Sequence, residues 1–293
     1  MNDRFAHVGI QPVPAPRLRR RKWYQGRPVA SGLVLAVILL GCLCCGWFAP
    51  KDPAYMDLGN AARAPGAQFW FGTDAMGRDI FSMIWYGGRI SLFIGLFASA
   101  ISTGVAVLVG AVSGLAPRWL DDILMRLTEI VLSIPNLLLV VLLQAVLGKA
   151  NVLSLAFVIG ITGWTGIAKV VRTEVRRLRS SGYVIAAWCM GGGFWHILRK
   201  HLTPNLVSAI MFMVVMNIRG AIAAESTLSF MGIGLPLEVI SWGSMLSQAE
   251  RSTLSGCWWI LLIPGVFLTV TLVCITDIGN HLRKSVSRGE SNL

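Results

Sequence analysis

The chain of 293 residues is 55% hydrophobic and only 14% charged, a balance too apolar for an ordinary soluble domain. Its formal charge is +12 at pH 7, with many of the basic residues between the apolar runs. These properties exclude a soluble globular protein and favour an integral membrane protein.

Six uncharged runs approach or reach the roughly 20 apolar residues that a helix needs to cross a bilayer. The third span is expected to start near Ile123, with Arg126 and Glu129 in its first turns. The fifth is expected to run past Arg219 towards Glu225. Unpaired backbone groups cannot face lipid, so the predicted fold class is all-α with six transmembrane helices. The six runs are residues 29–50, 90–117, 130–148, 150–168, 202–218 and 252–276.

Lys and Arg are unevenly distributed between the two sides that six spans define. With the N-terminus inside, 19 of the 26 Lys and Arg residues lie in the inner segments, which are residues 1–28, 116–127, 168–204 and the tail after Asp277. Cytoplasmic loops carry an excess of Lys and Arg, so both termini are predicted to be cytoplasmic. Topology and anionic lipid then explain the net charge. Nucleic-acid binding is not expected, because the basic run 17–22 directly precedes a span.

Residues 1–28 contain four prolines and eight charges without apolar periodicity, which predicts a flexible basic cytoplasmic arm. Residues 29–50 are interpreted as the first anchor helix. The alternative is a signal peptide, because residues 39–42 loosely resemble a lipoprotein cleavage box. However, the apolar run continues past Cys42 to Ala49, beyond the usual signal core of roughly 7–15 residues. The six cysteines lack zinc-ligand spacing and are interpreted as small apolar residues.

Residues 51–89 are predicted to form an external loop and a segment that leads into the second span. The sequence FGTDAMGRDIFSMIWYGGRISL covers residues 71–92. Its glycines suit turns, and Arg78 and Asp79 can pair or cap near a helix start. A structural role is favoured over solute binding. The stretch resembles the G-T-D-x-x-G-R-D-x-x-S segment of C-type permeases for dipeptides, oligopeptides and nickel. The matching residues are Gly72, Thr73, Asp74, Gly77, Arg78, Asp79, Ser82, Gly87, Arg89, Ser91 and Leu92.

A loop dense in arginine and lysine lies between the fourth and fifth spans, and YVIAAWCMGGGFWHILRKHLTP occupies residues 183–204. Residues 183–190 can form a short helix whose two alanines allow close approach to another surface. Three glycines then permit a sharp turn. A second helix is predicted over residues 194–202, and Pro204 suits the first turn of the fifth span. An amphipathic helix lying on lipid is the alternative interpretation.

This loop resembles the "EAA" loop of permease subunits in binding-protein-dependent ABC importers, which docks on the ATPase subunit. The resemblance makes residues 172–204 a coupling loop. The family's glutamate is replaced by Ile185, and the usual apolar residues before the proline are His201 and Thr203. The residues assigned to ATPase coupling are Ala186, Ala187, Gly191, Phe194, Trp195, Arg199, His201 and Pro204.

Further matches to the peptide and nickel permeases extend from Gly72 to Arg283, about 210 residues in order. They include Asp122, Met125, Arg126, Glu129 and Pro135, then Glu225, Leu228, Ser229, Phe230, Gly232, Gly234, Trp242, Gly243 and Met245, and then Trp258, Trp259, Pro264 and Gly265. The family's closing G-D-G-L-R-D is replaced by residues 279–284, GNHLRK. Residues 90–282 are therefore expected to form the transmembrane domain, and 283–293 a cytoplasmic tail.

Polar groups within spans are costly and mark pathways or structural pairs. The candidates are Glu129, Asn217, Arg219 and Glu225. An ion pair between Arg219 and Glu225 within one helix is not expected, because six residues place them on different faces. Pairing with another helix and contact with a solute both stay open. Pro135 is predicted to kink the third span, and broken helices are common along transport pathways.

The motifs of common enzymes are missing from the sequence. There is no G-x-x-x-x-G-K-S/T phosphate loop, so the chain itself is not expected to bind ATP. The four histidines are scattered, and no H-E-x-x-H or G-x-S-x-G occurs. We therefore expect no catalytic residue, no metal site and no cofactor in this chain.

The resemblance implies a permease subunit of an ATP-driven importer of di- or oligopeptides, which forms half of a pathway that works by alternating access. It implies a second homologous permease subunit, two ABC ATPase subunits that bind ATP and Mg²⁺, and an external solute-binding protein. The membrane would be the cytoplasmic membrane of a bacterium or archaeon. Import of nickel or a metal chelate is the alternative within the family. A membrane-embedded enzyme is the alternative from another class.

Overall fold

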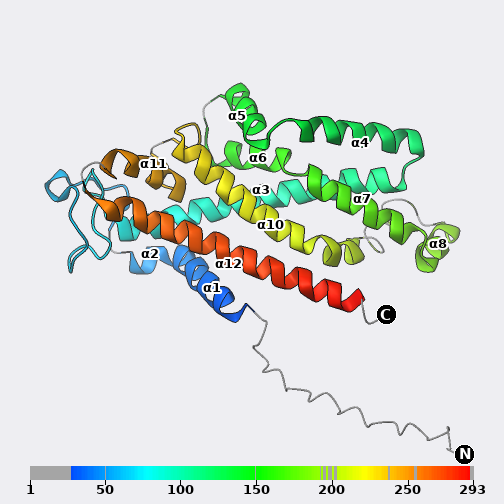
Figure 1. Ribbon diagram of the computed structural model, residues 1–293, viewed down its shortest axis with the longest axis horizontal. Helices are drawn as coiled ribbons and strands as arrows, with labels where there is room; N and C mark the ends of the chain where they lie inside the picture. Colours follow the sequence, from blue (N-terminus) through cyan, green and yellow to red (C-terminus); the bar gives the residue numbers. More distant parts are fainter. Residues whose placement is uncertain are drawn as a thin grey trace, which may run out of the picture.

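The computed structural model of the protein describes residues 28–49, 51–148, 150–191, 193, 196, 200, 203–236, 238–253 and 256–290. These residues form helices and loops, together with an isolated β-bridge between Thr73 and Asp79. The helices make an elongated bundle (Figure 1), and three long helices run along it: α3 (Ile80–Leu115), α10 (Thr203–Phe230) and α12 (Trp258–Glu290). Within the described residues, these three are long and apolar enough to cross a membrane unaided.

Two further candidate spans are bent. Helices α4 (Arg118–Ser133) and α5 (Asn136–Leu147) meet at 92°, and α6 (Val152–Thr162) and α7 (Thr165–Arg179) meet at 46°. The first apolar run forms only α1 (Val29–Leu43) and the single turn α2 (Cys45–Phe48). The part of the chain that is described therefore supplies three candidate spans, or five if each bent pair counts as one, where six were predicted.

The second predicted span begins earlier than its uncharged run. Helix α3 starts at Ile80, ten residues before Ile90, and takes up part of the predicted external segment. Its N-cap is Asp79, whose Oδ2 accepts hydrogen bonds from the Ser82 backbone N at 3.1 Å and from Ser82 Oγ at 2.7 Å. The predicted cap is therefore confirmed. Arg89 does not delay the helix, because a single charge leaves the helical backbone intact.

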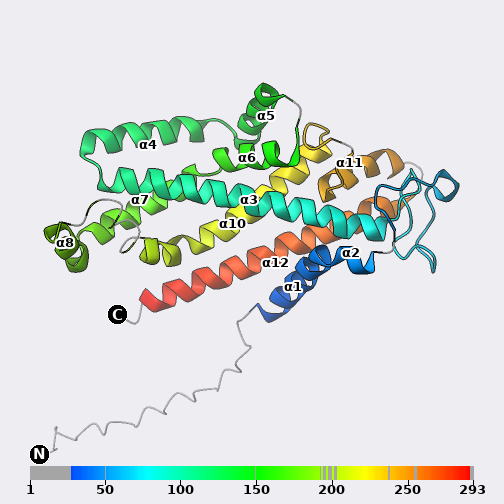
Figure 2. The same ribbon diagram turned by 180° about the vertical axis from the view of Figure 1, so that it is seen from behind.

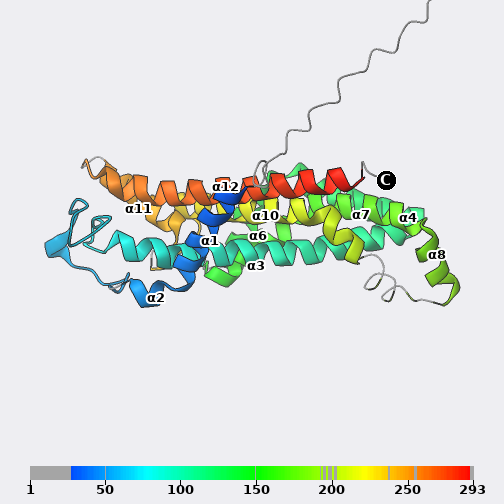
Figure 3. The ribbon, with the colours of Figure 1, turned by 90° about the horizontal axis from the view of Figure 1, so that it is seen from below.

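The two ends of the bundle carry different elements. The 3₁₀ turn η1 (Leu58–Asn60), the rest of loop 51–79 and helix α11 (Trp242–Thr253) lie at one end, which we call the α11 end. Helix α8 (Gly182–Cys189) lies at the other, the α8 end, as Figures 1 and 2 both show. Helix α1 crosses against α12 on the side of the bundle (Figure 3), where Ser31 Oγ donates to Asp277 Oδ2 at 2.7 Å.

The core consists of three clusters along the bundle. At the α11 end, the fully buried Trp242 packs with Met83 and Ile84, and its Nε1 donates to the Ile84 carbonyl at 2.9 Å. A middle cluster joins α3, α6 and α10. The third cluster, at the α8 end, joins α3, α7, α8 and α10 and includes Val171 and Leu206.

Candidate functional site

Both helix breaks open towards α10. At the first, Ile134 and Pro135 are extended with ψ of 128° and 126°. Proline has no backbone donor and disfavours a helical conformation at the residue before it, so α4 ends there. The predicted kink is therefore a complete break. At the second, residues 163 and 164 form a turn between α6 and α7.

These breaks and α10 enclose a cavity of about 370 Å³, which we call the central cavity. Its lining is apolar apart from a few neutral polar side chains, and none of the described residues around it is charged. Such a surface can contact a solute without holding it at a fixed charge. The lining residues are Val131, Leu132, Ile134, Pro135, Asn136, Leu139, Ile159, Thr162, Gly163, Thr165, Asn217, Gly220, Ala221 and Ala224.

Asn217 is the predicted polar candidate that lines this cavity. Its Nδ2 donates to Ser102 Oγ of α3 at 2.6 Å, which fixes the amide. Gly163 leaves room for it, because a Cβ there would lie 3.2 Å from Asn217 Oδ1. Sequence inspection missed Asn136, Thr162 and Thr165, although their position beside Pro135 or a glycine in an apolar run is a usable signal.

The three charged candidates lie elsewhere. Glu129 is half exposed on α4 and pairs with Arg126 of the same helix at 3.1 Å. Arg219 is exposed on α10. Among the ion pairs of the described residues, none joins Arg219 to Glu225, in agreement with their expected separation on the helix.

Glu225 is fully buried in a cluster of serines. Its Oε2 accepts from Ser91 Oγ of α3 at 3.0 Å and from Ser226 Oγ at 3.3 Å. Its Oε1 accepts from Ser229 Oγ at 3.0 Å and from Ser241 Oγ at 2.7 Å. The carboxylate therefore joins α3, α10 and the segment that starts α11. It does not line the central cavity.

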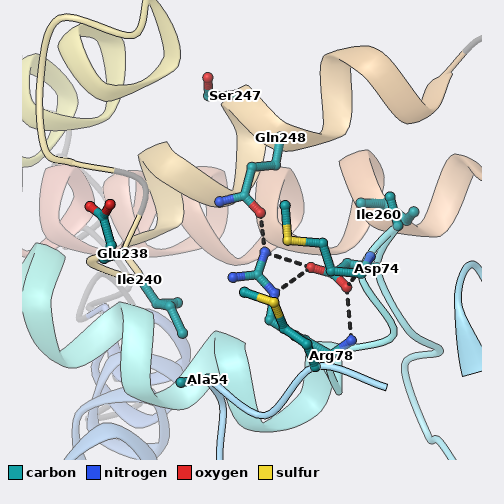
Figure 4. Close-up of a pocket in the computed structure, with 11 residues that line it drawn as sticks. Ala54, Asp74, Arg78, Glu238, Ile240, Ser247, Gln248 and Ile260 are labelled. Atoms are coloured by element: carbon teal, nitrogen blue, oxygen red, sulfur yellow. Dashed lines mark hydrogen bonds and ion pairs between the residues drawn. The ribbon is translucent and has the colours of Figure 1, made fainter. Parts of the chain in front are cut away.

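A larger cavity of about 490 Å³ lies at the α11 end (Figure 4). There Arg78 Nε donates to Asp74 Oδ2 at 2.7 Å, and its Nη2 donates to Gln248 of α11. The side chains of Asp74 and Arg78 are almost fully buried. Because these polar groups satisfy one another, we interpret them as holding loop 51–79 against α11, which is the structural role predicted for Arg78.

The predicted coupling loop, residues 172–204, begins in the last turns of α7 and continues through helix α8. Val184 and Ala187 are buried in the cluster that also contains residues of α3, α7 and α10, whereas Ile185 and Ala186 are exposed. Ala186 is therefore exposed and Ala187 is buried, because adjacent residues of a helix point in different directions, and the assignment of both alanines to ATPase coupling stays a prediction.

Gly191 follows α8 with a φ of +83°, a conformation that glycine adopts without steric cost. The predicted second helix lies largely outside the described residues, and with it Phe194, Trp195, Arg199 and His201. Pro204 lies in the first turn of α10, as predicted.

The fold resembles a solved transporter. A chain of the MetNI methionine ABC transporter, determined in inward-facing conformations, superposes with a TM-score of 0.56 and 16% identity. The match covers 70% of this chain and 96% of the other. The chain therefore shares its fold with that chain of the transporter.

Sequence comparison defines the family. Residues 106–288 match the binding-protein-dependent transport system inner membrane component family, and the chain belongs to it. The dipeptide transport system permease protein DppC of Bacillus subtilis (strain 168) is 34% identical, over 91% of this chain and 83% of its own. The oligopeptide permease OppC of the same organism is 34% identical over 87% of this chain and 83% of its own. The oligopeptide permease OppC of Haemophilus influenzae is 33% identical, over 97% of this chain and 92% of its own. The chain is thus a multi-pass membrane protein of a transport system.

Proposed function

We propose that this chain is a permease subunit of a peptide importer in the cytoplasmic membrane of a bacterium or archaeon. The observation that carries the proposal is the central cavity, which lies at two helix breaks in a chain similar to dipeptide and oligopeptide permeases. Broken helices around a cavity are a recurrent feature of transport pathways. A neutral lining suits peptides, because their side chains differ in charge.

The mechanism we propose is alternating access. A second, homologous permease subunit would complete the pathway around the central cavity. The exposed face of α8 would dock on one of two cytoplasmic ATPases, which bind ATP and Mg²⁺. The solute-binding protein would approach the α11 end. This arrangement assigns both termini to the cytoplasm and makes α1 and α2 together the first of six spans.

Uptake by a reconstituted complex tests this function. The chain is assembled in liposomes with its partner permease, ATPases and binding protein, and internal ATP is supplied. Labelled di- and tetrapeptides should accumulate, and unlabelled peptide should compete while Ni²⁺ should not. Accumulation of Ni²⁺ or of a nickel chelate without peptide uptake would contradict the proposal that peptides are the cargo. Uptake that is independent of ATP would contradict the proposed ATP-driven mechanism.

Replacing Gly191 by aspartate is expected to lower uptake per assembled complex by about tenfold or more. Aspartate at a φ of +83° is strained by roughly 1–2 kcal/mol, and it adds a charge beside the exposed apolar face of α8. Membrane insertion should be unchanged, because nothing lies within 4 Å of a Cβ at this position. Labelled-peptide uptake and the amount of membrane-inserted protein are measured together.

The matched control is Gly148→Asp, which imposes the same change at a φ of +84° in open space between α5 and α6. It should leave uptake near the wild-type rate. Equal uptake in the two variants would argue against docking through the segment that follows α8.

A further inference from the structure

A buried carboxylate at the α8 end joins three helices. Asp121, in the first turn of α4, is 1% exposed. Its Oδ1 accepts from Ser113 Oγ of α3 and from Arg172 Nε of α7, both at 2.5 Å. Its Oδ2 accepts from Arg172 Nη2 at 2.7 Å and from Arg176 Nη2 at 2.5 Å. The neighbouring Asp122, which the family pattern singled out, is exposed.

This cluster constrains geometry more tightly than the surface ion pairs nearby. Arg172 binds the carboxylate through two parallel N–H groups, an arrangement that fixes both distance and angle. A buried charge must keep its partners, because losing one leaves an uncompensated charge in a poorly solvated place. By contrast, the ion pair between Arg177 and Glu174, at 2.8 Å, joins two residues of the same helix.

Helices α3 and α7 are also in close backbone contact beside the cluster. A Cβ at Gly110 would lie 2.6 Å from the Ala168 carbonyl oxygen, and one at Gly114 would lie 2.7 Å from Val175 Cγ1. Such close packing leaves little room for the helices to slide. Asp121 adds α4 to this pair, so the end of α3, the start of α4 and α7 form one unit.

The unit connects α8 to the central cavity. Only Ser180 and Ser181 separate the end of α7 from α8, and the Ile185 N donates to the Ser181 carbonyl at 3.1 Å. In the other direction, α4 runs from Asp121 to the break at Ile134 and Pro135, which line the central cavity. A displacement of α8 therefore reaches the part of the cavity wall at the end of α4 only if α4 follows α7.

We propose that Asp121 is a positioning residue for transport: by holding α4 to α7 through Arg172 and Arg176, it makes the part of the central cavity wall at the end of α4 move with α8. The inference rests on the proposed function, in which an ATPase moves α8. In this proposal, the Asp121 carboxylate couples ATP hydrolysis to the passage of solute. The carboxylate itself does not contact the solute.

The test measures how many ATP molecules are hydrolysed for each peptide transported by Asp121→Asn in the reconstituted complex. Asparagine keeps the shape but removes the charge that holds two arginines. The expected result is continued ATP hydrolysis with about tenfold more ATP consumed per peptide. Glu174→Gln is the matched control on α7, because it removes an ion pair within that one helix, and its ratio should equal that of the wild type.

If Asp121→Asn does not assemble, Arg176→Gln provides the test. This variant removes one of the two arginines that bind Asp121 and leaves the two hydrogen bonds from Arg172. It should raise the ratio by a smaller factor, about threefold. A wild-type ratio in Arg176→Gln together with loss of assembly in Asp121→Asn would show that the cluster only supports the fold. A wild-type ratio in Asp121→Asn would also overturn the inference. If the wild-type complex moves no peptide but moves another solute, the proposed cargo fails and the ratio is measured with that solute.

Discussion

Tryptophan at position 220 is expected to reduce uptake to the background of protein-free liposomes. Gly220 lines the central cavity, and nothing lies within 4 Å of a Cβ built on it, so the new side chain can extend into the cavity without disturbing α10. An indole would occupy much of a space of about 370 Å³. Uptake of labelled peptide per assembled complex is the measurement, with ATP hydrolysis recorded in parallel.

Gly32→Trp provides the control for a bulky substitution in an apolar helix. A Cβ at Gly32 also has open space around it, but α1 lies on the opposite side of the bundle from α5 and α6, which border the central cavity (Figures 1 and 2). This variant should transport at the wild-type rate. Normal uptake by Gly220→Trp would exclude the central cavity from the pathway.

The second large effect is expected from Glu225→Ala, and it concerns stability. Four serine hydroxyls donate to this carboxylate, and each buried donor left unpaired costs about 1–3 kcal/mol. Some hydroxyls can rotate to other acceptors, so we expect a net loss of about 3 kcal/mol. Thermal unfolding of the complex in detergent should shift to a clearly lower temperature.

Glu225→Gln separates this structural role from contact with solute. Glutamine keeps one acceptor oxygen and the shape of the side chain, and serine hydroxyls can accept from its amide, so the loss of stability should be smaller. If Glu225 instead served the solute, Glu225→Ala would unfold at the wild-type temperature and transport poorly. That pattern would contradict the structural assignment.

Much of the fold follows from local chemistry that the sequence displays. The apolar runs locate the main helices, and Asp79 is recognisable as a cap because it precedes a helix and can reach a free backbone N–H. Pro135 signals an interruption, but the 92° bend does not follow from it. A proline removes one hydrogen bond, and packing of the surrounding helices decides whether the chain kinks or turns away.

The site is harder to predict. A charged residue in a span must have partners, because burying a charge costs free energy, but the sequence does not say which residues those partners are. Glu225 finds hydroxyls on residues as distant in sequence as Ser91 and Ser241, which only the folded bundle brings together. Asp121 lies 51 positions before Arg172 and 55 before Arg176 in the sequence, so no local pattern reveals that they pair. Which face of α8 is buried likewise depends on the packing of α3, α7 and α10. Asn217 was identified because a polar amide in an apolar run is conspicuous by itself.

The uncharged lining of the central cavity affects how solutes of different charge move. If the central cavity is part of the route, an ionised side chain of the solute meets no charged side chain among the described lining residues, so it forms no ion pair there. Peptides that differ only by lysine against glutamate should then encounter similar barriers at this point. Discrimination by charge, and sensitivity to ionic strength, would arise at the surfaces met before entry, where screening by salt is effective.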